Sequence, residues 1–464
     1  MNLQGKIKMD SRHHLKQITQ EQFHDYINIY GGIPPILGQE IAWFSDNEEK
    51  KIATIFFDRI DSNFSAVIFE RNVFGCFAQT NLEVDFPTPE DALQWIIKIM
   101  NQPTLKNETQ SNKLELFKDI VDVNKQNPIY KQLKNEPEWN SAKNLINEII
   151  PLYTDIDGNF IQQFQSEGFD QRLWELYLFN YFNEENLEID RSKSSPDFVL
   201  KKDKYIVGVE AVTISNRNDV KTTSNTNYKV PDENYLQNDM PLLWSGVLFN
   251  KLEHKSQDKG KKEKEHYWEK EGLGEKPFVI AVQDFHKEFS MTWSQNSLSE
   301  LLYGFRHSAE LKDDNLVITP HKVESYTKIN GTKISSGFFF SQPNAKYLSA
   351  VIANPLGTLP KFNRIGKELG YDKCNTIMLH HGLCYNHEIN AVKPKQFRYI
   401  VKEGKNEKWG DGVVVYHNPN CLYPLDEEMF PNACHYRLKN NLLETRTPPF
   451  SPFSSMTTIL KTVK

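Results

Sequence analysis

Hydrophobic and polar positions follow two different periods in the middle of this 464-residue chain. In the segment 170–183, apolar residues recur at helical spacing, and Asp170 is suited to cap the start of a helix. Residues 205–214 form a β-branched run typical of a buried strand, in which residues 206, 208, 210 and 212 share one face. Shorter runs at 187–190 and 197–200 predict two strands between them. The pattern therefore predicts a helix followed by three strands.

The segments on either side extend this order. Asp239 and Pro241 mark the start of another helix, residues 277–282 read as a strand, and a helix at about 294–303 is closed by Gly304. The predicted order is thus helix, three strands, helix, strand, helix. Upstream, the helical pattern of residues 114–152 predicts helices that buttress this region.

The first hundred residues predict a small α+β module. It comprises a helix at 20–29, a Gly-Pro turn at 31–35, three strands in an antiparallel meander, and a helix from Thr88 as N-cap and Pro89 to Met100. A polar, proline-containing linker at 102–113 places the boundary near residue 105. The three predicted strands are 52–57, 64–69 and 74–79.

The last third of the chain alternates strand-like runs with Gly, Pro and Asn turns, which predicts a β-rich C-terminal domain at 305–464. The chain would then comprise an N-terminal module of unknown role at 1–105, a middle domain at 114–304 with its core at about 160–304, and this third domain. A single core rarely exceeds about 250 to 300 residues, so the length agrees with several domains. The predicted C-terminal strands are 335–340, 345–352, 376–379, 397–401 and 413–416.

Composition narrows the class of protein. Hydrophobic residues make up 39% of the chain, enough to bury cores. No apolar run approaches the roughly 20 residues of a membrane span, and the N-terminus lacks a secretory pattern. Five cysteines do not suggest a disulfide framework. We therefore expect a soluble cytoplasmic protein with reduced cysteines and no membrane partner. The net charge of −6 argues against a wholly basic nucleic-acid-coating surface but allows a local basic groove.

Three carboxylates fall on consecutive predicted elements: Glu175 on the helix, Asp197 after Ser195-Pro196, and Glu210 in the buried strand. A buried glutamate requires a cation or a hydrogen-bond donor. If the two strands form a hairpin, Asp197 and Glu210 meet at one end of the sheet. Mg²⁺ (or Mn²⁺) bound by these two carboxylates, with Glu175 holding a bound water or a second ion, fits such a set.

These residues and their order resemble the PD-(D/E)xK superfamily, whose restriction-endonuclease-like fold is a mixed sheet flanked by helices. The resemblance covers about 160–304, a third of the chain. It implies a metal-dependent phosphodiesterase, an endonuclease acting on DNA, with Asp197, Glu210 and Glu175 as metal and catalytic residues. Restriction or phage defence would be its setting, and a homodimer would most simply cut both strands.

The chain departs from the family motif at one position. The lysine expected two residues after Glu210 is Val212. Lys251, on the following helix, is the candidate surrogate, although a lysine beside an apolar stripe usually extends to solvent. The alternative is a nuclease-fold protein without catalysis that serves as a nucleic-acid- or protein-binding scaffold. Taken singly, Glu210 could pair with a neighbour such as Arg172, and Asp197 could cap a turn.

Four other features have both a structural and a functional interpretation. The run 251–270 holds seven lysines among acids, which indicates a solvated segment or a DNA-contacting edge. The Gly357-Thr358 turn suits a structural turn better than a phosphate site. Asp284 and His286 could cap a loop. A zinc site would draw on the C-terminal soft ligands, of which only Cys384 and His387 have pair-like spacing. Those ligands are His380, His381, Cys384, His387, His417, Cys421, Cys434 and His435.

Overall fold

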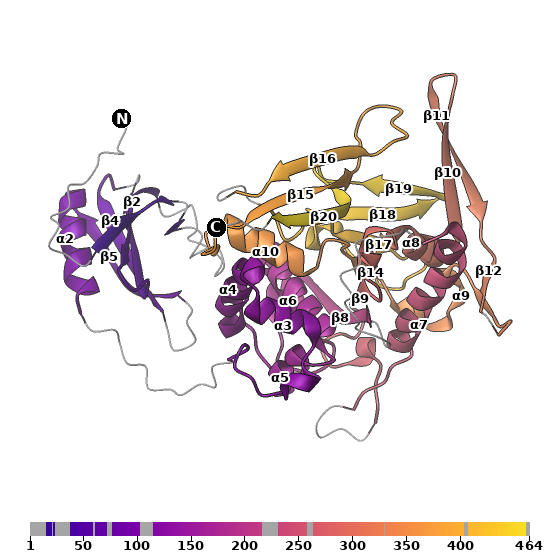
Figure 1. Cartoon of the computed structure of the whole chain (residues 1–464), viewed down its shortest axis with the longest axis horizontal. Coiled ribbons are helices and arrows are strands. Elements are labelled where there is room, and N and C mark those ends of the chain that lie inside the picture. The colour runs from indigo at the N-terminus through magenta and orange to yellow at the C-terminus, as the bar shows by residue number, and fades with distance from the viewer. Residues whose placement is uncertain are drawn as a thin grey trace.

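The computed structural model describes residues 15–20, 22–23, 38–58, 61–71, 77–102, 115–215, 231–257, 263–328, 330–402 and 407–460. Within these ranges the chain is a mixed α/β protein with several separate sheets. Figure 1 shows the N-terminal sheet at one end of the molecule and a larger sheet, flanked by helices, in the main body. The predicted linker at 102–113 and the predicted turn at 31–35 lie almost entirely outside the described residues.

The N-terminal sheet has five antiparallel strands in sequential order, two more than the pattern predicted. The helix predicted from Pro89 to Met100 is confirmed. It begins with Pro89, and the Thr88 side chain accepts a hydrogen bond from Asp91 N. Arg71 forms an ion pair of 2.5 Å with Glu148 of the following region. The elements are β1(Leu15–Ile18), β2(Gln39–Asp46), β3(Lys51–Phe57), β4(Phe64–Arg71), β5(Phe77–Phe86) and α2(Pro89–Met100).

The larger sheet has eight strands in the order β19-β18-β17-β14-β9-β8-β7-β6. Strands β6, β7 and β8 form an antiparallel meander, and β9 runs parallel to both β8 and β14. The strands are β6(Glu188–Asp190), β7(Phe198–Lys202), β8(Tyr205–Ser215), β9(Phe278–Phe285), β14(Ala350–Ala353), β17(Val414–His417), β18(Cys434–Lys439) and β19(Leu442–Arg446).

Helices cover both faces of this sheet. Val209 and Ala211 of β8 point into one hydrophobic cluster, which includes α6, whereas Val212 and Ile214 point into a second cluster, which includes α7 and α8. The alternation places Glu210 on the α7 face, as the period of two predicts. The main helices are α3(Pro128–Asn135), α4(Asn140–Ile149), α5(Phe160–Gln165), α6(Phe169–Glu184), α7(Met240–Leu252), α8(Gln295–Tyr303), α9(Phe338–Ser341) and α10(Leu359–Glu368).

The predicted order of helix, three strands, helix, strand and helix matches α6, β6, β7, β8, α7, β9 and α8. Gly304 ends α8 with a φ of +78°, as its predicted role requires. One detail at the start of α6 is wrong: its N-cap position is Gly168, and Asp170 lies within the first turn. The pKa of Asp170 is raised by burial to about 6 despite a hydrogen bond with Ser215.

The region after residue 305 divides between sheets. Strands β14, β17, β18 and β19 join β6–β9, so one sheet extends across the predicted boundary at 304/305. Two strand predictions are also wrong in part: 335–340 contains helix α9, and 345–347 belongs to the short helix η8(Pro343–Tyr347) before β14 begins. The other strands are β10(Phe305–Lys312), β11(Asn315–Lys322), β12(Ser325–Thr327), β13(Lys333–Ser335), β15(Ile377–Cys384), β16(Lys395–Ile400) and β20(Pro452–Leu460).

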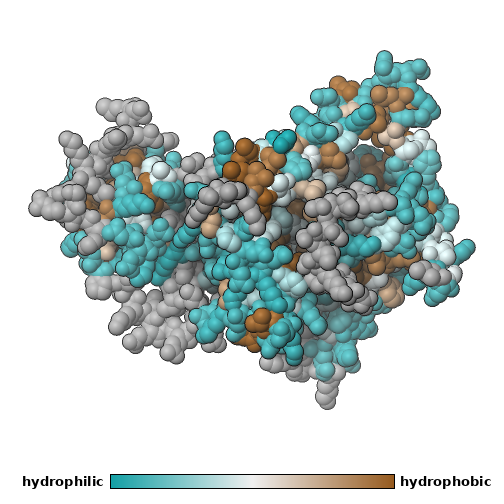
Figure 2. Space-filling view, viewed as in Figure 1, coloured by the Kyte–Doolittle hydropathy of each residue, from teal (hydrophilic) through white to brown (hydrophobic). Residues whose placement is uncertain are grey.

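The visible surface is mostly hydrophilic, with hydrophobic side chains in separate patches (Figure 2). Among the described helices, none combines the length and apolar character that a bilayer crossing requires.

Candidate active site

Glu210 lies at the centre of the candidate site, in the middle of β8. Its side chain is 7% exposed. Glu210 Oε1 accepts hydrogen bonds from Lys251 Nζ at 2.5 Å and from Tyr267 Oη at 2.9 Å, and Oε2 accepts one from the backbone N–H of Asp197 at 3.2 Å. The buried carboxylate therefore has both the cation and the donors that its position demands.

Lys251 reaches Glu210 from the last turn of α7, which packs on the same face of the sheet. Burial lowers the pKa of Lys251, but the Glu210 and Asp197 carboxylates outweigh this effect and leave its pKa above the ordinary value. The ammonium therefore stays charged at neutral pH. Val212, where the family motif has lysine, instead packs among apolar side chains of the second cluster, including Trp244 and Leu248.

Asp197 directly precedes β7, after a cis Ser195-Pro196 peptide. Its Oδ2 accepts a hydrogen bond from Ala211 N at 2.8 Å, and no described residue donates to its Oδ1. Burial and the neighbouring Glu210 and Glu175 carboxylates raise the pKa of Asp197 well above its ordinary value. Burial and repulsion thus both favour the binding of a proton or a cation by the Asp197 carboxylate.

Glu175 projects from α6 and is almost fully buried, with 1% of its surface exposed. Arg172 Nη1 donates to both of its oxygens, at 3.0 Å and 2.8 Å, and Tyr153 Oη donates to Oε2 at 2.8 Å. Gln171 Nε2 adds a hydrogen bond to Oε1 at 3.1 Å. The Arg172 pairing considered for Glu210 thus belongs to Glu175, which is saturated by protein donors.

The structure does not gather the three carboxylates into one compact ligand set. Among the described residues, only His417, Glu427 and His435 place three His, Cys, Asp or Glu ligand atoms within 4.8 Å of one another. Asp197 and Glu210 are nevertheless in direct contact through the Asp197 N–H. Two carboxylates, one with an open oxygen, match the hard oxygen ligands and low ligand count that Mg²⁺ takes from proteins.

The His417, Glu427 and His435 cluster brings together two of the soft ligands noted in the sequence. His417 Nε2 and His435 Nδ1 are hydrogen-bonded at 2.9 Å, and His435 Nε2 contacts the Phe430 carbonyl at 2.9 Å. Glu427 forms ion pairs with Arg437 and Arg446. Each member therefore already has a protein partner. Cys384 is instead buried at the end of β15. Its thiol donates a hydrogen bond to the backbone carbonyl of Lys395 on the neighbouring strand β16.

The remaining sequence features have structural roles in the described residues. Gly357 packs against the rings of Trp174 and Tyr177 on α6, which agrees with a structural turn. Asp284 Oδ1 accepts a hydrogen bond from the backbone N–H of His286, at 3.1 Å, and contacts His286 Nδ1 at 2.6 Å. In the lysine-rich run, residues 258–262 lie outside the described part of the chain.

Sequence reasoning missed the side chains that hold the carboxylates in place. Tyr267, on the short helix η6(Tyr267–Glu269), binds Glu210 across 57 residues, and Tyr153 binds Glu175 across 22. Neither residue carries a motif. Only Gln171 and Arg172, one turn before Glu175 on the same helix, were discoverable from spacing.

Comparisons of this chain with protein-family models, with curated proteins and with solved structures found no match.

Proposed function

We propose that this protein is a metal-dependent phosphodiesterase that cleaves DNA, built on a restriction-endonuclease-like core. The order α6, β6, β7, β8, α7, β9 supports this proposal, because it is the order that the PD-(D/E)xK resemblance implies. So does the pairing, an antiparallel meander with a fourth strand parallel to the third. Restriction or phage defence is the setting that we propose for it.

The observation that carries the proposal is the contact between Lys251 Nζ and Glu210 Oε1. A lysine beside two carboxylates is the constellation that the motif implies, and here the lysine comes from a helix rather than from the strand. Its ammonium is charged at neutral pH, so it suits the stabilisation of negative charge on a phosphate better than proton abstraction.

Mg²⁺ fits the donor set of Asp197 and Glu210, and when bound it supplies an activated water and charge neutralisation at the scissile phosphate. Asp197 contributes its open Oδ1. The hydrogen-bonding capacity of Glu175 is filled by Arg172 and its other donors. Gln171 Nε2 donates to Glu175 and also to Ala211 O, at 3.3 Å, so Glu175 positions α6 against β8 through Gln171. Tyr267 orients Glu210.

A second candidate function also has an observation in its favour. Glu210 and Glu175 already have cationic partners, Lys251 and Arg172, so these two carboxylates need no metal ion to remain buried. A nuclease-fold scaffold that binds nucleic acid or protein without cleaving it could keep this network for stability alone.

A cleavage assay separates the two. Purified protein is incubated with plasmid and with single-stranded DNA in Mg²⁺, in Mn²⁺ and in chelator, beside Asp197→Ala. Asp190→Ala is the matched control, because Asp190 is a half-buried acid on β6 that pairs with Lys201. We expect metal-dependent cleavage that only Asp197→Ala abolishes. No cleavage by the folded wild type on any substrate favours the scaffold.

A further inference from the structure

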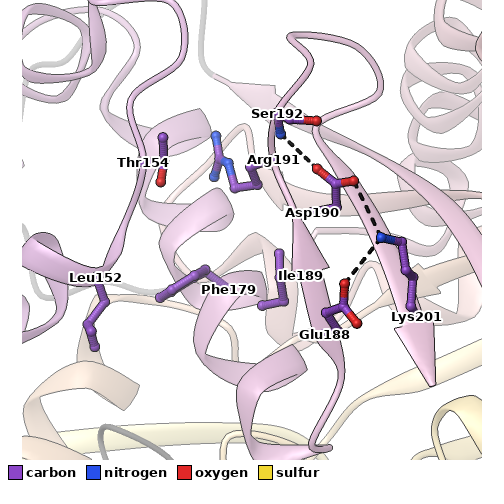
Figure 3. Close-up of a pocket in the computed structure, with 9 residues that line it drawn as sticks. All are labelled: Leu152, Thr154, Phe179, Glu188, Ile189, Asp190, Arg191, Ser192 and Lys201. Carbon is purple, nitrogen blue, oxygen red and sulfur yellow. Dashed lines mark hydrogen bonds and ion pairs between the residues drawn. The ribbon is translucent and has the colours of Figure 1, made fainter. Parts of the chain in front are cut away.

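A cavity of about 410 Å³ opens beside the candidate site, between β6, the turn that follows it and the segment 152–154. Leu152, Phe179 and Ile189 supply apolar side chains, and Thr154 and Ser192 contribute hydroxyls to the lining (Figure 3). This volume falls within the range of roughly 300 to 1,000 Å³ that is usual for ligand sites.

The two cations of the cavity are in different electrostatic states. Lys201 bonds Glu188 at 3.1 Å and Asp190 at 3.6 Å, so its charge is compensated. Figure 3 shows these three side chains directed toward one another, whereas Arg191 projects the other way, toward Thr154. Arg191 forms no ion pair with a described residue, and its buried Nε and Nη1 have no hydrogen-bond partner.

Arg191 is held in place by aromatic rings rather than by acids. Its guanidinium carbon lies 3.9 Å from the ring centroid of Tyr153 and 4.9 Å from that of Phe198. Stacking fixes the plane of the guanidinium but does not replace the hydrogen bonds that Nε and Nη1 lack. A planar, uncompensated guanidinium suits an oxyanion, and phosphate matches its fork geometry.

The same two rings connect the cavity to the candidate site. Tyr153 donates its hydroxyl to Glu175 Oε2 at 2.8 Å, and Phe198 directly follows Asp197. One aromatic side chain, Tyr153, therefore connects Arg191 to the Glu175 carboxylate.

We propose that this cavity binds a phosphate group of the nucleic-acid substrate through Arg191, with the apolar wall contacting the adjoining sugar or base. This inference rests on the proposed function, and it specifies how that site holds its substrate. The phosphate has two possible sources: a monophosphate at the end of a strand, or a backbone diester next to the scissile one.

Binding measured in chelator tests the proposal without any cleavage. Fluorescence anisotropy would follow a short single-stranded DNA, with either a 5′-phosphate or a 5′-hydroxyl, against wild type and Arg191→Met. Removing a charged hydrogen-bond donor should weaken binding about tenfold or more. Arg191→Lys should retain most of the affinity. Lys439→Met, a control on β18 outside the cavity, should change affinity less than twofold, because its ammonium is exposed and paired with Glu444.

Melting temperatures first confirm that the variants are folded. Each outcome of the binding measurement then has one interpretation. A preference for the 5′-phosphate that only Arg191→Met removes identifies a terminal phosphate. Equal weakening of both oligonucleotides by Arg191→Met identifies a backbone diester. Wild-type affinity in Arg191→Met for both overturns the proposal. Because no step requires cleavage, a protein that binds through Arg191 but never cuts would refute the proposed enzyme and leave the phosphate site standing.

Discussion

Lys251 Nζ lies 2.5 Å from Glu210 Oε1, although the two residues belong to different elements 41 positions apart in the chain. In the nuclease that we propose, this tertiary contact takes the place of the short-range spacing of the PD-(D/E)xK motif. It requires α7 to pack on the even-numbered face of β8, and the burial of Val212, Trp244 and Leu248 in one hydrophobic cluster agrees with this packing.

Removing the Lys251 ammonium should abolish most DNA cleavage. Lys251→Met keeps the length of the side chain but loses the charge that faces the substrate. Loss of one preorganised charge donor typically costs on the order of 10² to 10³ in kcat. Initial cleavage rates at saturating Mg²⁺ would measure this. Exposed Lys255 provides the control, and Lys255→Met should cleave at the wild-type rate. Equal rates for the two variants would show that Lys251 has no part in the chemistry.

Asp197→Asn should stabilise the protein at neutral pH while it removes activity. The pKa of Asp197 is raised in the folded state, so the unfolded chain loses this proton first as pH rises. Wild-type stability should therefore fall from about pH 4 up through the raised pKa and stay reduced above it. The variant lacks this loss. Thermal melts from pH 3.5 to 8 should show the two proteins alike at the acidic end and Asp197→Asn more stable at the neutral end.

Asp190 provides a control of opposite sign. Hydrogen bonds from Ser192 lower the pKa of Asp190, and Lys201 adds to the effect. Its contribution to stability is present above the ordinary pKa and is lost as pH falls through the lowered one. Asp190→Asn should therefore be slightly less stable than wild type at neutral pH. A melt in which both variants shift in the same direction would argue against a charge-based explanation.

Mg²⁺ should raise the melting temperature of the wild type, and the increase should grow with pH. Protons compete with the ion for Asp197, whose raised pKa keeps it protonated to a higher pH than an ordinary aspartate. A ligand at one hundred times its Kd stabilises the folded state by about 2.7 kcal/mol. Calorimetry in Mg²⁺ or chelator at pH 5.5 and pH 8 would measure the difference. A pH-independent shift, or an equal shift in Asp197→Ala, would place the ion elsewhere.

Arg172 and Glu175 should behave as one unit in a double-mutant cycle. Glu175 is almost fully buried, so Arg172→Met leaves its carboxylate without the cation, at a cost of about 2 to 3 kcal/mol. Glu175→Gln should cost a similar amount, and the double variant much less than the sum. Urea unfolding would provide the three values. Additive losses would mean that the pair is not coupled.

The Gly357 turn can be tested through its packing. An added Cβ would lie 2.7 Å from Trp174 Cζ3, so Gly357→Ala should destabilise the fold by about 1 to 3 kcal/mol. Gly246 lies exposed in α7, with nothing within 4 Å of an added Cβ. Gly246→Ala should therefore stabilise the protein by about 0.5 to 1 kcal/mol. A Gly357→Ala variant that keeps its stability but loses DNA binding would restore the phosphate-site interpretation.

Local signals predicted the elements around the site well. The helical spacing of α6, the β-branched run of β8 and the Gly304 cap are properties of neighbouring residues, and each is found where the pattern placed it. The three consecutive phenylalanines at 338–340 were misleading, because aromatic residues favour strands on average. Here Phe338 and Phe339 are buried in the second cluster from a helical turn, and Phe340 is exposed.

Long-range pairing accounts for most of what the sequence did not predict. Nothing local in residues 350–353 indicates that they pair with β9, and nothing local in residues 414–417 indicates that they pair with 350–353 to continue the sheet. The partners of the carboxylates are hidden for the same reason. Tyr267 and Lys251 approach Glu210 only after α7 and η6 have packed, so their roles depend on tertiary structure and not on any motif.

The continuous eight-stranded sheet also has a consequence for synthesis on the ribosome. Strand β9 ends at Phe285, but its second neighbour β14 begins at Ala350, and β17 begins only at Val414. The nascent chain must therefore carry an apolar, unpaired β9 edge until β14 is complete at Ala353, about 68 residues later. This takes about 3 to 14 seconds at typical elongation rates. During that interval the growing polypeptide is a natural client for chaperones, and a chain released at residue 304 would be prone to aggregate through this edge.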